Sequence, residues 1–205
     1  MRSEDPARAT ELPLFPLGTV LLPGAELRLR IFEARYLDLV RACAREGGGF
    51  GICLIVEGRE AGGPSTSVAV GTEALITDFG TTDDGLLGLT VRGARRFHVE
   101  RTRVRDNGLA VGEVRWLPDP PPTPVRAEHG LLAQLLARIL DHFGGPHANP
   151  PASALDDAAW VGWRLAEMLP LSDLQRQGLL EEPDPDRRLE RLLALLPELK
   201  GSETA

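Results

Sequence analysis

The chain has 205 residues, which is enough for one large domain or two small domains with hydrophobic cores. An apolar content of 42% excludes wholesale disorder, and a formal net charge of −7 argues against a surface built to grip nucleic-acid backbones. The charge is uneven, since residues 1–118 carry a net −1 and residues 119–205 a net −6.

The first part of the chain alternates short apolar runs with turn residues, a pattern typical of β-strands. We predict strands at residues 12–15, 27–32, 51–56, 68–78, 86–92, 95–105 and 109–117. Asp-Asp-Gly at 83–85 and Asp-Asn-Gly at 106–108 indicate two hairpins. The Asn-Gly pair in the second predicts a type I′ turn, which requires positive φ angles at both central residues.

One helix interrupts these strands. Across residues 33–45, Tyr36, Leu39, Val40 and Cys43 fall at helical spacing and form one apolar face, which three glycines then end. Many short strands with one inserted helix predict a small, partly closed barrel.

Strand 95–105 changes its apolar parity. Phe97 and Val99 share one face, whereas Thr102 and Val104 have the opposite parity. Because side chains alternate strictly along a strand, this implies either a β-bulge near residues 100–101 or an early end to one-sided burial. We favour the bulge, because barrels need bulges to close.

Five prolines within residues 118–124 predict a semi-rigid, extended spacer and a domain boundary. The pattern after it is helical. The first predicted helix has an apolar stripe and ends at Gly-Gly (144–145); the stripe is Leu131, Leu132, Leu135, Leu136, Ile139 and Phe143. A second helix covers residues 156–169.

Two more helices carry start signals. Ser172 to Gln175 fits a capping box, so a third, short helix begins there. Asp184 and Pro185 supply an N-cap and a first-turn proline for a fourth helix over 186–196. The buried stripe of this fourth helix is predicted to be Leu189, Leu192, Leu193 and Leu196.

These patterns divide the chain into five parts. We expect a tail at 1–10, a β-barrel domain at 11–118, a proline-rich linker at 119–124, a four-helix subdomain at 125–200 and a second tail at 201–205. No apolar run approaches the length of roughly 18–20 residues that spans a membrane, and the N-terminus lacks a signal segment. With two cysteines and no CxxC spacing, a cytoplasmic protein without membrane association is expected.

Catalytic signatures are missing. The chain has no phosphate-binding GxxxxGK[ST] loop and no GxSxG, and its one lysine, Lys200, lies close to the C-terminus. His142 and His147 lie near Asp141, but no HExxH or cysteine pair supports a metal site. Cys43 and Cys53 fall in apolar surroundings, where thiols behave as small hydrophobes. We expect no enzyme activity, metal or cofactor.

Arginines gather on two neighbouring predicted strands around Phe97: Arg92, Arg95, Arg96, Arg101, Arg103 and Arg105. Arginine beside an aromatic ring can grip nucleic acid or an acidic peptide. The alternative, which we favour, is a solvated sheet face balanced by nearby acidic residues.

Several segments, in order, resemble the N-terminal domain of Lon proteases. They are Leu-Pro-Leu-Phe-Pro-Leu at 12–17, Val-Leu-Leu-Pro-Gly at 20–24, Ile-Phe-Glu-Ala-Arg-Tyr at 31–36, Val-Gly-Thr at 70–72 followed by Ile76, Val-Arg-Gly-Ala-Arg-Arg-Phe at 91–97, Leu-Ala-Glu-Met-Leu-Pro-Leu-Ser at 165–172, and residues 177–195. The resemblance covers residues 11–197, and as an ordered set the segments are specific.

This resemblance implies an α+β fold: a PUA-like, mostly antiparallel β pseudo-barrel with one inserted helix, then a helical subdomain. In Lon an ATPase and a Ser-Lys protease follow this region, and the chain stops where they would begin. The resemblance therefore implies a non-catalytic protein- or peptide-binding module, such as an adaptor or a chaperone-like factor in protein quality control. Its expected partners are unfolded or tagged proteins, or a partner protease; the oligomeric state stays open.

An extended peptide can add to an exposed barrel edge through backbone hydrogen bonds, or occupy a groove between barrel and bundle. The candidate peptide-binding residues are Phe15, Phe32, Arg35, Tyr36, Arg95 and Arg96. For the three aromatic residues, core packing is the alternative. RNA binding through the arginine-rich strands is the second functional hypothesis, disfavoured by the overall acidity, and an undetected small-molecule or hydrolase site is the third.

Overall fold

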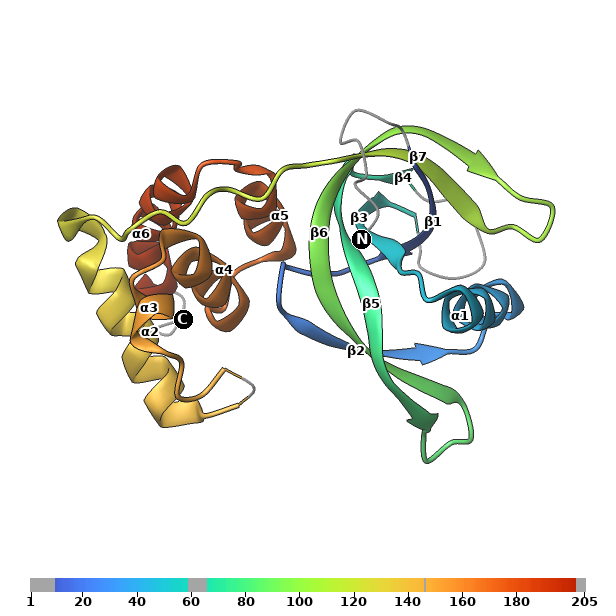
Figure 1. Cartoon of the computed structure of the whole chain (residues 1–205), viewed down its shortest axis with the longest axis horizontal. Helices are drawn as coiled ribbons and strands as arrows, with labels where there is room; N and C mark the ends of the chain where they lie inside the picture. The colour runs from blue at the N-terminus through green and yellow to red at the C-terminus, as the bar shows by residue number, and fades with distance from the viewer. Residues whose placement is uncertain (1–9, 59–65, 146, 202–205) are drawn as a thin grey trace. The chain divides into compact units, whose positions relative to one another are not determined.

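The computed structural model describes residues 10–58, 66–145 and 147–201, with side chains through residue 197 (Figure 1). It divides into two compact units, which meet in the sequence between Asp119 and Pro120. The tails predicted at 1–10 and 201–205 lie outside the described residues except for Thr10, which begins the first strand, and Gly201, which ends the last helix.

The first unit is a mostly antiparallel barrel. Its elements are β1 (Thr10–Leu17), β2 (Glu26–Ile31), α1 (Ala34–Glu46), β3 (Phe50–Glu57), β4 (Thr66–Ser67), β5 (Val70–Thr81), β6 (Leu87–Val104) and β7 (Ala110–Trp116). The strand order is β1-β7-β6-β5-β3-β4, and a parallel pairing of β1 with β3 closes the ring. The strand β2 lies off this path and pairs with β6.

The long strand β6 organises the barrel. The sequence predicted two strands here, at 86–92 and 95–105, but the chain forms one strand of 18 residues. This strand pairs with β2 and β5 along its first part and with β7 along its last part. The predicted bulge is confirmed, because the β6–β7 register shifts between Val99 and Arg101; beyond it Thr102 and Val104 are both exposed.

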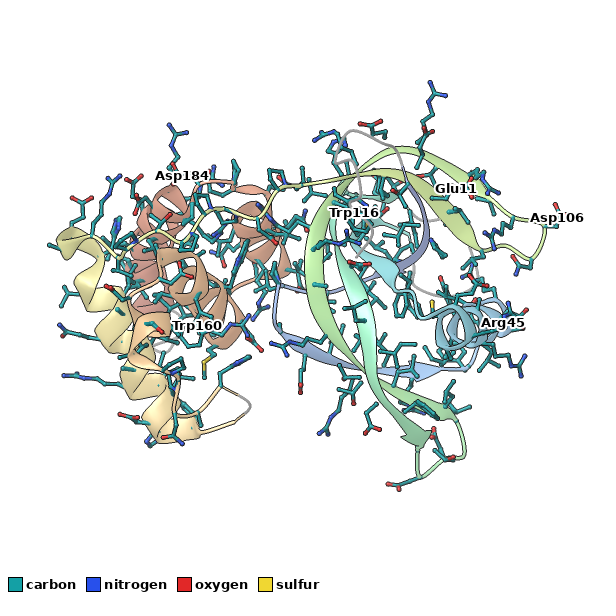
Figure 2. All side chains as sticks on the ribbon, viewed as in Figure 1. Glu11, Arg45, Asp106, Trp116, Trp160 and Asp184 are labelled. Atoms are coloured by element: carbon teal, nitrogen blue, oxygen red, sulfur yellow. The ribbon has the colours of Figure 1, made fainter. Side chains whose placement is uncertain are left out.

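Both predicted hairpins are present, but the turn type predicted at 106–108 is wrong. Gly108 has a φ of 80°, whereas Asn107 is not among the described residues with positive φ, which a type I′ turn requires. The Gly108 N–H donates to Arg105 O at 2.8 Å, and the Arg105 N–H donates to Leu109 O at 2.9 Å. This is the longer hairpin loop with glycine in the left-handed position, and Asp106 lies near its tip (Figure 2).

The barrel core is apolar. Leu12, Leu14, Cys53, Phe97 and Val114 form one buried cluster, with Trp116 packed against it. The helix α1 lays its predicted apolar face, Tyr36, Leu39, Val40 and Cys43, onto the barrel, and all four residues are buried. Gly47, with a φ of 70°, ends this helix in the left-handed conformation that glycine adopts without strain.

The second unit is helical. Its elements are the 3₁₀ helix Ala127–His129, α2 (Gly130–Phe143), α3 (Ala152–Leu155), α4 (Ala158–Met168), α5 (Asp173–Glu181) and α6 (Pro185–Gly201). Four helices were predicted; the single turn α3 was not, because it is too short to show a period. The capping box at Ser172 and Gln175 is confirmed.

Two predicted stripes need correction. In α2 the buried residues are Leu132, Leu136 and Leu140, whereas Leu131 and Phe143 of the predicted stripe are exposed. In α6 Leu189 and Leu192 are buried, but Leu193 is 40% exposed. Each helix therefore buries a narrower strip than its apolar composition suggested, as expected for a helix packed on one side.

The prolines at 118–124 are not a free spacer throughout. The Ala158 N–H donates to Thr123 O at 2.8 Å, and the Val125 N–H donates to Asp156 O at 2.9 Å. Pro124 and Asp157 form an antiparallel bridge between these bonds. The end of the predicted linker therefore belongs to the helical unit, where it anchors the start of α4.

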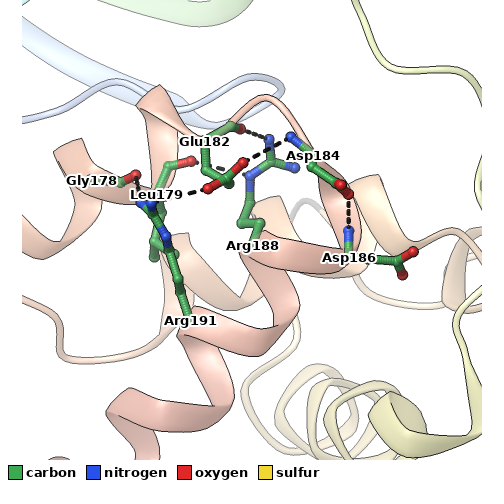
Figure 3. Close-up of polar contacts among 7 residues, drawn as sticks. All are labelled: Gly178, Leu179, Glu182, Asp184, Asp186, Arg188 and Arg191. Carbon is green, nitrogen blue, oxygen red and sulfur yellow. Dashed lines mark hydrogen bonds and ion pairs between the residues drawn. The ribbon is translucent and has the colours of Figure 1, made fainter.

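A buried arginine joins α5 to α6 (Figure 3). The Arg188 Nε–H donates to Leu179 O at 3.1 Å, its Nη2 donates to Glu182 O, and its guanidinium lies over the Trp163 ring, 3.5 Å from the centroid. The exposed Arg191 donates to Gly178 O and pairs with the buried carboxylate of Glu182. These contacts bind the end of α5 and the 182–184 loop to the first turns of α6.

Across the part of the chain that the structure describes, no helix is both long and apolar enough to cross a membrane.

Candidate functional site

A groove of about 500 Å³ runs beside β2 in the barrel unit. We call it the β2 groove, and its lining residues come from β1, β2, α1 and the segments that join them: Phe15, Leu17, Thr19, Leu27, Arg28, Leu29, Arg30, Phe32, Glu33 and Tyr36. Its walls are mostly apolar, with two arginines and one glutamate.

The position of the groove follows from which residues of β2 line it. Side chains along a strand point alternately to opposite faces, so a pocket on one face touches every second residue. Here four consecutive residues, 27 to 30, line the groove. The groove therefore lies along the edge of β2.

None of the strands that the structure describes lies beside that edge. Within the described residues, β2 pairs with β6 alone. The Gly93 N–H donates to Ala25 O at 2.9 Å, which fixes the residues of β2 that bond to β6 as Leu27, Leu29 and Ile31 by antiparallel alternation. The backbone N–H and C=O groups of Glu26, Arg28 and Arg30 consequently point to the open edge.

Two stacked aromatic rings form the floor. The Phe15 and Tyr36 centroids are 3.9 Å apart with an interplanar angle of 19°, and Phe50 packs against Phe15 from the barrel interior. Both Phe15 and Tyr36 are buried. Since rings held on both sides keep one orientation, the floor is rigid and apolar.

Arg35 stands next to the floor. Its guanidinium lies 4.7 Å from the Tyr36 centroid, donates to Gly108 O at 3.0 Å and pairs with Glu33 at 2.9 Å. The Glu33 side chain makes no cap hydrogen bond at the start of α1, so its role there is the ion pair. Arg35 thus ties the first turn of α1 to the β6–β7 hairpin.

Phe32 is the exposed aromatic residue of the groove, with 61% of its surface accessible. It directly follows Ile31, the buried last residue of β2, and lies between this strand and α1. Covering the exposed phenylalanine ring with a ligand is favourable, because it removes apolar surface from water.

The structure brings four of the six sequence-predicted candidates together and leaves two elsewhere. Phe15, Phe32 and Tyr36 line the groove, and Arg35 stacks on Tyr36. Arg95 instead pairs with the buried Glu73 at 3.0 Å and lies over Trp116, 3.8 Å from the ring centroid.

Arg96, proposed as a surface residue, is 2% exposed and donates to Pro118 O at 3.3 Å. It therefore has no place on a binding surface, which corrects the sequence-based choice.

Several arginines of the arginine-rich strands form ion pairs with acidic residues of this protein, so fewer of them are available to bind a ligand than the sequence suggested. Beyond the two residues just described, Arg103 pairs with Glu11 at 2.8 Å, and Arg115 on β7 pairs with Glu100 at 3.2 Å. This supports the balanced, solvated sheet face that we favoured over a nucleic-acid grip.

Sequence reasoning missed the β2 residues of the groove. The signal was the Leu-Arg-Leu-Arg alternation at 27–30, which indicates a strand buried on one face. Alternation does not reveal whether a strand has one neighbour or two, so the open edge could not be inferred.

Neither cysteine is an exposed thiol, and among the described residues no group of three or more His, Cys, Asp and Glu side chains is placed to hold a metal ion. Burial raises the pKa of the Cys53 thiol to about 12. For Cys43 the pKa is raised by burial and, to a lesser extent, by the Glu46 charge. Both thiols are thus held in the protonated, unreactive form at neutral pH.

This pKa predicts a pH dependence of stability. Between pH 9 and pH 12 the unfolded chain loses the Cys53 proton while the folded protein keeps it, so the free energy of unfolding falls as pH rises. We expect the stability advantage of the wild type over Cys53→Ala to shrink by about 1.4 kcal/mol per pH unit in this window. Urea unfolding of both proteins at several pH values measures it; a constant difference would contradict the raised pKa.

Comparison with known proteins places this geometry in a family. The family model for the ATP-dependent protease La (LON) substrate-binding domain matches residues 11–198. A crystal structure of a Lon N-terminal domain protein from Xanthomonas campestris is 56% identical, with a TM-score of 0.76, and the match covers 90% of this chain and 98% of that one.

The N-terminal domain of the Lon protease of the Mycobacterium avium complex shares the fold at 20% identity, with a TM-score of 0.67 and coverage of 90% of this chain and 97% of that one. A search of curated proteins gives no significant match. The expected α+β fold and the resemblance to Lon are confirmed, and the chain belongs to the LON substrate-binding domain family.

Proposed function

We propose that this chain binds extended segments of unfolded or tagged proteins at the open edge of β2, as a cytoplasmic adaptor or chaperone-like factor that acts alone or with a partner protease. The observation that carries the proposal is the coincidence of an unpaired strand edge with an apolar groove along it. Membership in a substrate-binding family supports protein segments as the ligand class.

The groove supplies both parts of strand addition. Backbone groups of Glu26, Arg28 and Arg30 can bond to an incoming strand whatever its sequence, which suits a protein that must accept many substrates. Apolar side chains of that strand then contact the Phe15–Tyr36 floor and the exposed Phe32. This binding needs no nucleophile, base or metal.

The first test is a fluorescence-anisotropy titration of labelled, reduced and carboxymethylated lactalbumin, a permanently unfolded protein. Saturable binding at low and at moderate salt is expected, because apolar contact and backbone hydrogen bonds resist screening better than exposed ion pairs do. Failure to bind at either salt concentration would contradict the proposal.

A proline substitution tests the strand edge itself. In Arg28→Pro the outward N–H is lost while the ladder to β6 keeps its bonds, since Leu27 and Leu29 make them; proline is tolerated on edge strands. We expect binding of the unfolded protein to weaken about tenfold, through one lost hydrogen bond and steric exclusion of the neighbouring strand.

The matched control is Arg28→Ala, which removes the same side chain and keeps the N–H. It loses the guanidinium group but should bind the unfolded protein more tightly than Arg28→Pro does, and both variants should show the wild-type circular dichroism spectrum. Equal affinities of the alanine and proline variants would show that the ligand does not add to this edge.

A further inference from the structure

We infer that the β2 groove selects extended segments in which apolar and acidic side chains alternate, an inference that rests on the proposed function and names its substrate class. The two faces of β2 differ sharply in chemistry. Leu27, Leu29 and Ile31 point toward the barrel, whereas Glu26, Arg28 and Arg30 are exposed on the other face.

The two faces of an added strand would therefore meet different chemical surroundings. Residues directly opposite each other in paired strands carry their side chains on the same face, with Cβ atoms roughly 4.5–5.5 Å apart. Side chains of the ligand opposite Leu27 and Leu29 therefore meet the apolar floor. Those opposite Arg28 and Arg30 lie beside guanidinium groups, where a carboxylate is favoured and an ammonium is disfavoured.

The arginines are available for this contact. Arg28 has no hydrogen bond or ion pair to any residue that the structure describes. Arg30 pairs with Asp84, but both side chains are about half exposed or more, and such pairs contribute little stability. A ligand carboxylate can therefore share or replace this partner.

The acidic residues near the groove do not abolish its preference for acidic ligand side chains, and they limit how many such side chains are favoured. Glu33 is already paired with Arg35 at 2.9 Å, and Asp84 with Arg30. Glu26 lies at the far end of the exposed face, so it disfavours a third acidic residue there. The preferred segment thus has two acidic side chains spaced two residues apart, between apolar ones.

Four fluorescein-labelled heptapeptides test this pattern on the full chain. The alternating peptide is Thr-Val-Glu-Val-Glu-Val-Thr; two others replace both glutamates by glutamine or by lysine, and the fourth, Thr-Val-Val-Val-Glu-Glu-Thr, has the same composition without alternation. We expect the glutamate peptide to bind best, on the order of 2- to 30-fold tighter than the glutamine peptide, from two opposite-charge cross-strand pairs. The lysine and the non-alternating peptides should bind more weakly than the alternating one.

Charge reversal supplies the decisive variant. In the double variant Arg28→Glu with Arg30→Glu, the order of the glutamate and lysine peptides should invert. The control, Arg138→Glu with Arg187→Glu, changes the net charge equally at two exposed arginines of the helical unit and should leave the order unchanged. Both substituted pairs are exposed, so a wild-type circular dichroism spectrum is expected for each variant.

The possible results distinguish a failure of this inference from a failure of the proposed function. If all peptides bind equally, or their order ignores the charge reversal, selection for alternating acidic residues is overturned, while the peptide binding itself keeps the proposed edge addition. If no peptide binds, the inference and the strand-edge mechanism both fail.

Discussion

Replacing Gly93 by alanine is expected to destabilise the barrel by about 3 kcal/mol or more, at the upper end of overpacking costs. A Cβ at this position would lie 2.1 Å from Leu22 O, far inside van der Waals contact with a backbone atom. The strand has no room to retreat, because the Gly93 N–H donates to Ala25 O at 2.9 Å and its carbonyl accepts from the Gly24 N–H at 2.8 Å.

Gly80→Ala is the matched control. Gly80 lies on β5, and a Cβ added there would have no neighbour within 4 Å. Its effect should stay within about 0.5 kcal/mol, as for most surface substitutions. Urea unfolding followed by circular dichroism compares both variants with the wild type; a Gly93→Ala variant as stable as Gly80→Ala would show that the strands separate easily at this point.

Local structure was largely predictable because local patterns determine it. The α1 face, the hairpins, the bulge near residue 100 and the Ser172 capping box each depend on residues within a few positions of one another. The wrong turn type at 106–108 shows the limit of this. Asn-Gly is compatible with more than one hairpin loop, and the register of β6 against β7 decides between them.

The strand pairing that closes the barrel could not be predicted from local sequence patterns. The parallel pairing of β1 with β3 joins segments roughly forty residues apart, and no period in the sequence records it. Two strands were predicted in place of the single strand β6 because a glycine at position 93 usually indicates a break in a strand. Here the glycine is needed for a different reason: the backbone of Leu22 approaches so closely that a Cβ would not fit.

The candidate site was predictable in its aromatic part. Phe15, Phe32 and Tyr36 were named because they stand in the segments that resemble Lon, and they line one groove. The choice of Arg96 had a physical cause of error: arginine is usually a surface residue, and burial at 2% depends on the Pro118 carbonyl, which lies on another segment.

The second large effect on stability is expected in the helical unit, from replacing the buried Arg188. We expect Arg188→Met to lower the free energy of unfolding by about 3 kcal/mol, because two buried carbonyl groups lose their donor. Leu179 lies near the end of α5, and the residue four positions later is Pro183, which has no N–H to close the helical bond. Arg188 supplies that donor at 3.1 Å, bonds to Glu182 O as well and lies over the Trp163 ring.

Arg187→Met separates this cause from the loss of a charge. Arg187 is the preceding residue on the same helix and is exposed, so the substitution changes the net charge and the helix propensity equally but removes no buried donor. Its stability should stay within about 0.5 kcal/mol of the wild type. Urea unfolding followed by tryptophan fluorescence reports on the helical unit through Trp160 and Trp163 of α4, together with Trp116 of the barrel unit. If the two variants unfolded at the same urea concentration, the carbonyl groups of Leu179 and Glu182 would have to find other donors, and the stability of the α5–α6 junction would not depend on the Arg188 side chain.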